Sequence, residues 1–422
     1  MSAGIFHPAY RSTCRQFHIA TAAFSFTMPF RMLRYLTAGE SHGEALIAFL
    51  SGLPAGLSID QAFVDRELWR RQQGYGRGGR MKIERDTAHI LSGVRHGRTI
   101  GSPIAMMLQN RDWQNWKDSL PVEMGDPGKH KRVGSPRPGH ADLAGALKYD
   151  FPEARYVLER ASARESAARV AIGALAKLFL RELGIEVLSH VIAVGSVSLA
   201  DQEIAWEQIE ALARKDEVLL SCADPAIEQR MKEEVDQVLR TGDSLGGVFE
   251  VVAHGVPPGL GTYAQWDERL DALLAAAVMS LQAVKAVEIG SGIQAAHSPG
   301  SAVHDEIGYG GKSEFTAFSR THNNAGGIEG GISNGEAIRV RGYLKPISTL
   351  RRPLQSVDFA SREPVKAAYE RSDVCVVPAG GVAAEAMVAL TLARCALDKF
   401  GGDSMKETKR NFQGYLEQLK HY

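Results

Sequence analysis

The chain has 422 residues, and its 49 Lys plus Arg balance its 49 Asp plus Glu, so its formal net charge is zero. This balance argues against a protein that binds nucleic acid non-specifically or docks on an acidic membrane, because both depend on excess positive charge. Hydrophobic residues make up 44% and charged residues 23% of the sequence, which is typical of a globular protein rather than a disordered one.

Residues 1–31 differ from the rest of the chain. They contain no Asp or Glu and carry Arg11, Arg15 and Arg31. One interpretation is an acid-poor targeting segment, and the other is a misassigned start, because Met32 opens a strand-like run. We favour the second, since no apolar core of a secretory signal is present. We therefore expect a disordered extension or false start over 1–31, a single domain over 32–422 and a cytoplasmic protein, with a targeting role left open.

Five helices are predicted in chain order, over residues 60–72, 162–183, 224–240, 266–281 and 383–397. Asp60 and Asp224 are the expected N-caps of the first and third. Ser162 and Glu165 form the sequence pattern of a capping box, and Gly184 supplies the expected stop of the second helix.

Strands are predicted over residues 33–36, 187–197, 248–253, 283–289 and 337–344. They are interspersed with the helices without a regular βαβ repeat, so we expect an α+β fold in one large domain. No run approaches the ~20 apolar residues of a membrane span. Glu385 interrupts the most apolar late stretch, which we interpret as a core helix.

Three glycine-rich matches to nucleotide-binding motifs fail on context. Residues 74–79 follow a helix and lead into an extended run, and residues 290–295 are followed by Ser298-Pro299-Gly300, which forbids the required helix. The third match, Gly311-Lys312-Ser313, has the sequence that ends a P-loop, but Glu306 stands where the first glycine of that motif belongs. The four cysteines form no C-x-x-C pair, so we also expect no metal site.

Two histidines lie in segments suited to proton transfer. His42 lies in Gly39-Glu40-Ser41-His42-Gly43, just after a predicted strand, and His140 lies in Pro136-Arg137-Pro138-Gly139-His140-Ala141-Asp142. Histidine titrates near neutral pH, and two prolines hold the second segment rigidly. The alternatives are a loop histidine bonded to backbone and a rigid turn with incidental polar residues.

Arginines gather in two segments that suit anion binding. Residues 70–80 contain four arginines among glycines, with no carboxylate before Glu84, so we expect unpaired guanidinium groups there. Arg160 and Arg164 flank a predicted helix N-terminus, which attracts anions. The alternatives are a solvated basic loop and a simple helix cap at Ser162.

Two late segments complete the set. The glycine-rich run over residues 323–335 precedes Lys345-Pro346-Ile347-Ser348-Thr349, a composition that suits a phosphate, and Arg371-Ser372-Asp373 precedes an apolar segment. A flexible surface loop and a structural ion pair are the alternatives. Taken together, the segments predict a site for more than one phosphorylated anionic ligand, worked by two histidines and one aspartate.

These segments together resemble the chorismate synthase family, in order, from about Met32 to about Leu397. The first segment around His42, residues 160–164 and residues 371–373 are similar to its three signature segments. Ala161 departs from the pattern, because the family often has a second serine there, which puts one hydrogen bond to the flavin in doubt. The resemblance implies a β-α-β sandwich in which antiparallel sheets enclose helices, assembled as a homotetramer.

The resemblance also implies the activity. The family converts 5-enolpyruvylshikimate 3-phosphate to chorismate and phosphate by a 1,4-elimination with reduced FMN (FMNH2) and no net redox change, the last common step of aromatic amino acid biosynthesis. It implies that His42 protonates the departing phosphate, that His140 protonates or stabilises the reduced flavin, and that Asp373 helps to draw the proton from flavin N5.

The resemblance assigns the binding residues by position. The substrate or NADP would be held by Arg71, Arg77, Arg80, Arg137 and Arg164. FMN would be held by Arg160, Ala161, Ser162, Gln282, Ala283, Gly330, Lys345, Pro346, Ile347, Ser348, Thr349 and Arg371.

Two rival functions stay open at this point, a Mg-ATP phosphoryl transferase and a non-catalytic flavin or anion binder. The first needs a carboxylate pair beside a phosphate loop, and no convincing pair is evident. NADPH is a possible source of reductant in this family. Since no extra segment is dedicated to reduction, we expect an external flavin reductase.

Overall fold

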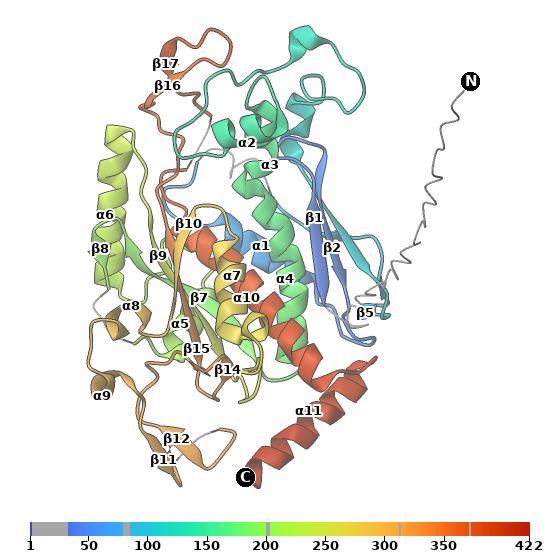
Figure 1. Ribbon diagram of the computed structural model, residues 1–422, viewed down its shortest axis with the longest axis vertical. Helices are drawn as coiled ribbons and strands as arrows, with labels where there is room; N and C mark the ends of the chain where they lie inside the picture. Colours follow the sequence, from blue (N-terminus) through green and yellow to red (C-terminus); the bar gives the residue numbers. More distant parts are fainter. Residues whose placement is uncertain (2–32, 79–84, 200–202, 312–313, 371–372) are drawn as a thin grey trace. The chain divides into compact units, whose positions relative to one another are not determined.

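The computed structural model describes Met1 and residues 33–78, 85–199, 203–311, 314–370 and 373–422, and residues 32–422 form one compact unit. The fold is α+β, as predicted: two antiparallel sheets enclose a layer of helices (Figure 1). The expectation for residues 1–31 lies outside the described residues.

The first sheet has the strand order β1-β2-β6-β3, with every pairing antiparallel. Its strands are β1 (Arg34–Ala38), β2 (Ala45–Ser51), β6 (Ile104–Gln109) and β3 (His89–Ile90). In β2 and β6 buried and partly exposed residues alternate, so one face of the sheet is apolar and packs on helices.

The second sheet has the order β10-β15-β9-β7-β8 and is also antiparallel. Its strands are β7 (Glu186–Val194), β8 (Val197–Ser198), β9 (Gly247–His254), β10 (Val284–Ile289) and β15 (Ile338–Leu344). The strand predictions for this sheet are confirmed to within a few residues. Its antiparallel pairings agree with the rejection of a dinucleotide-binding fold.

The helix layer consists of α1 (Gln61–Gln72), α4 (Ser166–Arg181), α7 (Leu270–Met279) and α10 (Val377–Phe400). α10 packs on α4 and on β7 and β9, whereas α4 also packs on β2 (Figure 1). Gly173 of α4 lies against Ala386 of α10, where an added Cβ would stand 2.2 Å from the alanine Cβ. The two helices therefore approach closely because one contact position has no side chain.

The remaining described elements surround this sandwich. The other helices are α2 (Asp142–Tyr149), α3 (Arg155–Ala161), α5 (Trp206–Ala213), α6 (Pro225–Thr241), α8 (Gly292–Ala295), α9 (Gly300–Val303) and α11 (Met405–Lys420). Short strands form hairpins: β4 (Val94–Arg95) with β5 (Arg98–Thr99), β11 (Ile307–Tyr309) with β12 (Phe318–Arg320), β13 (Ile328–Glu329) with β14 (Ile332–Ser333), and β16 (Gln355–Val357) with β17 (Pro364–Lys366). The 3-10 turns are η2 (Arg111–Asn115), η3 (Pro127–Lys129), η4 (Ala163–Glu165) and η5 (Trp266–Glu268).

Two predicted helix starts are confirmed by their caps. The Asp60 side chain accepts from the backbone N–H of Phe63 at 3.2 Å. The Asp224 side chain accepts from Ala226 and Ile227 at 2.8 and 3.0 Å.

The predicted capping box was wrong. Ser162 accepts from Arg164 and caps a 3-10 turn, so the α-helix begins four residues later, at Ser166. The Glu165 carboxylate instead binds Thr37, Arg169 and Gln282, of which Arg169 provides a charged donor.

Two other boundaries also differ from prediction. The helix predicted over 266–281 is split, because η5 precedes α7 and Trp266 is exposed. The helix predicted over 383–397 extends to Val377–Phe400, which by length and composition alone is enough to cross a membrane. Its most apolar window is 78% buried within the protein, so we keep the interpretation of a core helix.

Candidate active site

A cavity of about 730 Å³ is lined by α1, the turn at η4, the start of α10 and the loop after β15. This volume is in the range of cofactor and substrate sites. Among the residues predicted for the site, the cavity is lined by His42, Arg71, Arg77, Arg137, His140, Ala161, Ser162, Arg164, Gln282, Ala283, Lys345, Pro346, Ile347, Ser348, Thr349 and Asp373.

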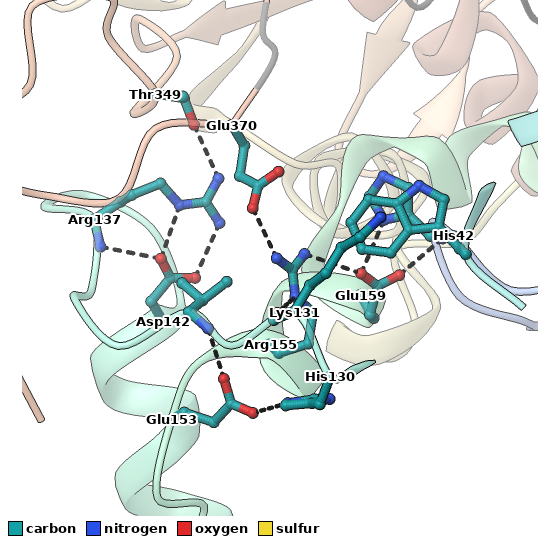
Figure 2. A network of polar contacts seen from close by, with 12 residues as sticks. His42, His130, Lys131, Arg137, Asp142, Glu153, Arg155, Glu159, Thr349 and Glu370 are labelled. Carbon is teal, nitrogen blue, oxygen red and sulfur yellow. Dashed lines mark hydrogen bonds and ion pairs between the residues drawn. The ribbon is translucent and has the colours of Figure 1, made fainter. Parts of the chain in front are cut away.

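His42 is held from two sides. Its Nδ1 lies 2.9 Å from Glu159 Oε1, and its backbone N–H donates to Glu159 Oε2 at 2.8 Å (Figure 2). The Trp116 ring packs on the imidazole with centroids 4.0 Å apart. Burial alone would raise the pKa of Glu159, but the hydrogen bonds and charge of His42 outweigh it and lower that pKa. His42 therefore faces an ionised carboxylate.

His140 belongs to a second such group. Its Nδ1 lies 2.5 Å from Asp142 Oδ1, and Arg137 donates to the same carboxylate through Nε and Nη2 at 2.8 and 3.0 Å. Arg137 also donates to Thr349 Oγ1 at 2.9 Å, which ties this group to the loop after β15 (Figure 2). Burial would raise the pKa of Asp142, but His140 and Arg137 together hold it far below its usual range.

Arg71 and Arg164 share one buried carboxylate. Arg164 Nη1 donates to both Asp86 oxygens at 2.6 and 2.7 Å, and Arg71 Nη1 lies 3.4 Å from Oδ2. Burial lowers the pKa of Arg71, and although Asp86 opposes this, Arg164 and Arg77 lower it further, to about 10. Two cations on one anion leave net positive charge on the cavity wall, which favours an anionic ligand.

Arg77 and Asp373 come together from distant segments. Arg77 Nη1 lies 3.1 Å from Asp373 Oδ2, and the backbone N–H of Gly78 donates to Oδ1 at 2.5 Å. The prediction of unpaired guanidinium groups over residues 70–80 was therefore wrong where the structure describes them. Arg70 binds Glu67 and Glu385, and Arg71 and Arg77 meet Asp86 and Asp373.

The part of the wall formed by Ala161, Ala283 and residues 345–349 combines small residues with polar groups. Ala283 has a φ of +69°, a left-handed conformation that is strained for a residue with a Cβ. Its carbonyl accepts from the backbone N–H of Lys345 at 3.0 Å. Lys345 Nζ donates to the Gly139 carbonyl at 2.6 Å. Burial, with the nearby charge of Lys285, lowers the pKa of Lys345.

Two predicted residues lie away from the cavity lining. Arg160 donates to the carbonyls of Gly39 and Thr37 at 3.0 and 2.9 Å, so it fixes the end of β1. Gly330 occupies the turn between β13 and β14, with φ +58°. Arg80 and Arg371 lie outside the described residues.

Sequence reasoning missed four residues that hold the site: Asp86, Trp116, Asp142 and Glu159. Asp142 is two positions from His140, inside the segment singled out for that histidine, so this carboxylate was a usable signal. Glu159 directly precedes Arg160 but is 117 positions from His42, so the sequence did not link it to that histidine. Asp86 is 78 positions from Arg164 and Trp116 is 74 positions from His42, and no local pattern marks either pair.

Comparisons with known proteins agree on one family. Residues 33–397 match the family model described as chorismate synthase. The chain is 73% identical to a chorismate synthase of Koribacter versatilis over 393 residues, covering 93% of this chain and 100% of the relative. It is 70% identical to that of Acidobacterium capsulatum over 394 residues, with the same coverage. A solved structure titled "Crystal Structure of Chorismate Synthase" matches with a TM-score of 0.74 and 42% identity, covering 93% of this chain and 99% of that one.

Proposed function

The chain belongs to the chorismate synthase family, and we propose that it is a carbon–oxygen lyase that converts 5-enolpyruvylshikimate 3-phosphate to chorismate and phosphate with reduced FMN. The observation that carries the proposal is the composition of one cavity: two histidines, each bonded to a buried carboxylate, face a space also lined by four arginines and a lysine.

The charge of the cavity wall suits this substrate. One phosphate and two carboxylates must leave water on binding, which requires cations placed to meet them. Arg71, Arg77 and Arg164 supply guanidinium groups on one side, and Arg137 supplies another beside His140. Zero net charge on the whole chain then accompanies a local positive field.

In the elimination, the C3–O bond to phosphate breaks, hydrogen leaves C6, and the electron pair forms the new double bond of the conjugated ring. His42 would donate a proton to the departing phosphate, because a protonated phosphate is a better leaving group. Glu159 stabilises the charged imidazole before transfer, and the arginines bind the phosphate after it.

The described residues fit FMN. The small side chains of Ala161 and Ala283, with the left-handed backbone at Ala283, leave space for a flat ring to approach closely. The segment from Lys345 to Thr349 offers an ammonium group and two hydroxyls for a phosphate. When bound, reduced FMN supplies electron density to the reacting substrate and a base for the C6 hydrogen. His140 would hold a proton against the flavin's negative charge, and Asp373 would accept one from its side of the cavity.

The assay that tests the proposal is anaerobic. Purified protein, 5-enolpyruvylshikimate 3-phosphate and chemically reduced FMN should give chorismate and phosphate in equal amounts. Failure of both products to appear would overturn the proposal and favour a non-catalytic flavin or anion binder.

The same assay with oxidised FMN and NADPH tests the source of reductant. We propose dependence on an external flavin reductase, so this mixture should give no product until a reductase is added. We further propose a cytoplasmic homotetramer acting in aromatic amino acid biosynthesis, with 32–422 as its single domain. Sedimentation analysis of the purified chain tests the assembly.

A further inference from the structure

Glu159 holds His42 in place, although no contact between Glu159 and the substrate is needed for the proposed reaction. Glu159 lies on α3 and is only 4% exposed, and its two oxygens accept from different groups of one residue. Its own carbonyl accepts from the Ser41 backbone N–H at 2.9 Å. Glu159 therefore fixes the backbone and ring of His42 with two hydrogen bonds and the backbone of the preceding Ser41 with a third.

The described histidine–carboxylate pairs differ in which ring nitrogen they use. His42 and His140, which line the cavity, meet Glu159 and Asp142 through Nδ1. His130 lies off the cavity lining and meets Glu153 through Nε2 (Figure 2). His190 also lies off the lining and meets Glu250 through Nε2.

The nitrogen that meets a carboxylate carries a proton, because a carboxylate only accepts hydrogen bonds. The bond at one ring nitrogen thereby decides the role of the other. In His42 the carboxylate occupies Nδ1, so proton exchange with the cavity falls to Nε2.

We propose that Glu159 is a positioning residue that holds a proton on His42 Nδ1 and aims Nε2 at the reacting phosphate. The kinetic part of this proposal rests on the proposed function. Trp116 restricts the ring from its face, while Glu159 fixes it within its plane. Arg155 Nη1 lies 3.5 Å from the same carboxylate, so a further cation helps to keep Glu159 ionised (Figure 2).

Glu159→Gln gives a sharp test because an amide offers only one accepting atom. The backbone N–H of His42 needs an acceptor, so the amide oxygen of the substituted side chain should face it. The NH2 group of the amide then faces Nδ1. Nδ1 then has to accept, so the proton of the neutral ring moves to Nε2. This inverts the tautomer with almost no change in side-chain volume.

Glu153→Gln is the matched control. Glu153 is also buried, and it binds the His130 ring and the Val133 backbone N–H, but neither Glu153 nor His130 lines the cavity. Glu159→Gln should lower kcat by roughly 10- to 100-fold with KM within about threefold of wild type, as for an impaired general acid. Glu153→Gln should keep kcat within about twofold.

Nitrogen-15 NMR of labelled histidine provides the second readout, with His42→Ala used to assign the signal. In the neutral imidazole, wild-type His42 should show a protonated Nδ1, and Glu159→Gln a protonated Nε2. An unchanged kcat in Glu159→Gln, or a wild-type His42 protonated only at Nε2, would overturn the proposal. If Glu159→Gln does not fold, the wild-type spectrum still decides. A wild-type protein that makes no chorismate would refute the proposed function, while the spectrum still tests Glu159.

Discussion

Two neighbouring arginines show how differently the fold treats the same side chain. Burial would lower the pKa of Arg70, but Glu385 and Glu67 outweigh it and raise it well above the usual range. Burial lowers the pKa of Arg71, and the charges of Arg164 and Arg77 lower it further, to about 10, against the opposing effect of Asp86. Arg70 is thus satisfied by its partners, whereas Arg71 keeps its charge at a cost that an anionic ligand would relieve.

Opposite effects on stability follow from this contrast. Arg71 has a folded pKa below its unfolded value, so at neutral pH its charged form destabilises the fold, and this penalty begins to diminish only as the pH rises above about 10. Arg71→Met should therefore raise the free energy of unfolding without ligand by about 1–2 kcal/mol. It should also weaken substrate binding.

Arg70→Met is the matched comparison for Arg71→Met. It leaves the buried carboxylates of Glu385 and Glu67 to share the charge of Lys177, and it should lower the free energy of unfolding by about 3–5 kcal/mol. Chemical denaturation of both variants measures the difference. A loss of stability in Arg71→Met as large as in Arg70→Met would contradict this interpretation.

His42 carries the sharpest prediction for activity. His42→Ala should reduce turnover by about 100-fold or more, the typical contribution of a general acid. FMN binding, measured by flavin absorbance or fluorescence titration, should change little, because the wall assigned to FMN is built from other residues. Turnover equal to wild type would refute the proposed role.

At the level of helices and strands, α4 and α10 pack closely against each other. Gly173→Ala would place a Cβ 2.2 Å from the Ala386 Cβ and 2.5 Å from its Cα, so the helices must separate. We expect a loss of at least about 1–3 kcal/mol, as for other overpacked cores. Both helices contribute to the cavity wall, so activity should fall as well.

Gly414→Ala is the control for this substitution. Gly414 lies within α11, and no heavy atom outside its immediate neighbours is within 4 Å of an added Cβ. The change should raise stability by about 0.5–1 kcal/mol through helix propensity. Thermal unfolding of the two variants should give shifts of opposite sign, and a Gly173→Ala variant as stable as wild type or more stable would show that the α4–α10 contact is not tight.

Local signals in the sequence predicted many of the helices and strands. Asp60 and Asp224 marked helix starts because N-capping depends on neighbouring residues alone. Glu165 misled because its partner Thr37 is 128 positions away, and tertiary contacts outweighed the local pattern. The length of α10 was underestimated: the helix begins at Val377 and includes Gly380 and Gly381, which lie against Leu344 and Ser189 of the sheet.

For the whole molecule, buried ionised carboxylates make the free energy of unfolding depend on pH in the acidic range. Burial would raise the pKa of Glu250, but His190, Arg339 and Arg341 outweigh it and lower the pKa to about 2. Its folded pKa lies below its unfolded value, so its contribution is complete above about pH 4.5 and is lost as the pH falls to about 2. This amounts to about 3 kcal/mol.

Denaturation midpoints between pH 6 and pH 2 measure that loss. Glu250→Gln should be less stable at pH 6 and should lose less stability on acidification than wild type. Equal losses in the two proteins would show that Glu250 does not contribute to the acid dependence.

Only part of the site could be predicted from the sequence. The segments around His42 and His140 were recognised individually, and the resemblance joined them into one site. The shared use of Asp86 by Arg71 and Arg164, and the contact of Arg77 with Asp373 across 296 positions, depend on how the sheets and helices close around the cavity. A pairing across such distances leaves no trace in a single sequence.

The most direct test of the account is a crystal structure of the protein with FMN and 5-enolpyruvylshikimate 3-phosphate. It should contain both molecules in the 730 Å³ cavity, with the substrate phosphate within hydrogen-bonding distance of His42 Nε2 and the flavin against Ala283 and Lys345. A substrate phosphate remote from His42, or a flavin bound outside this cavity, would contradict the account.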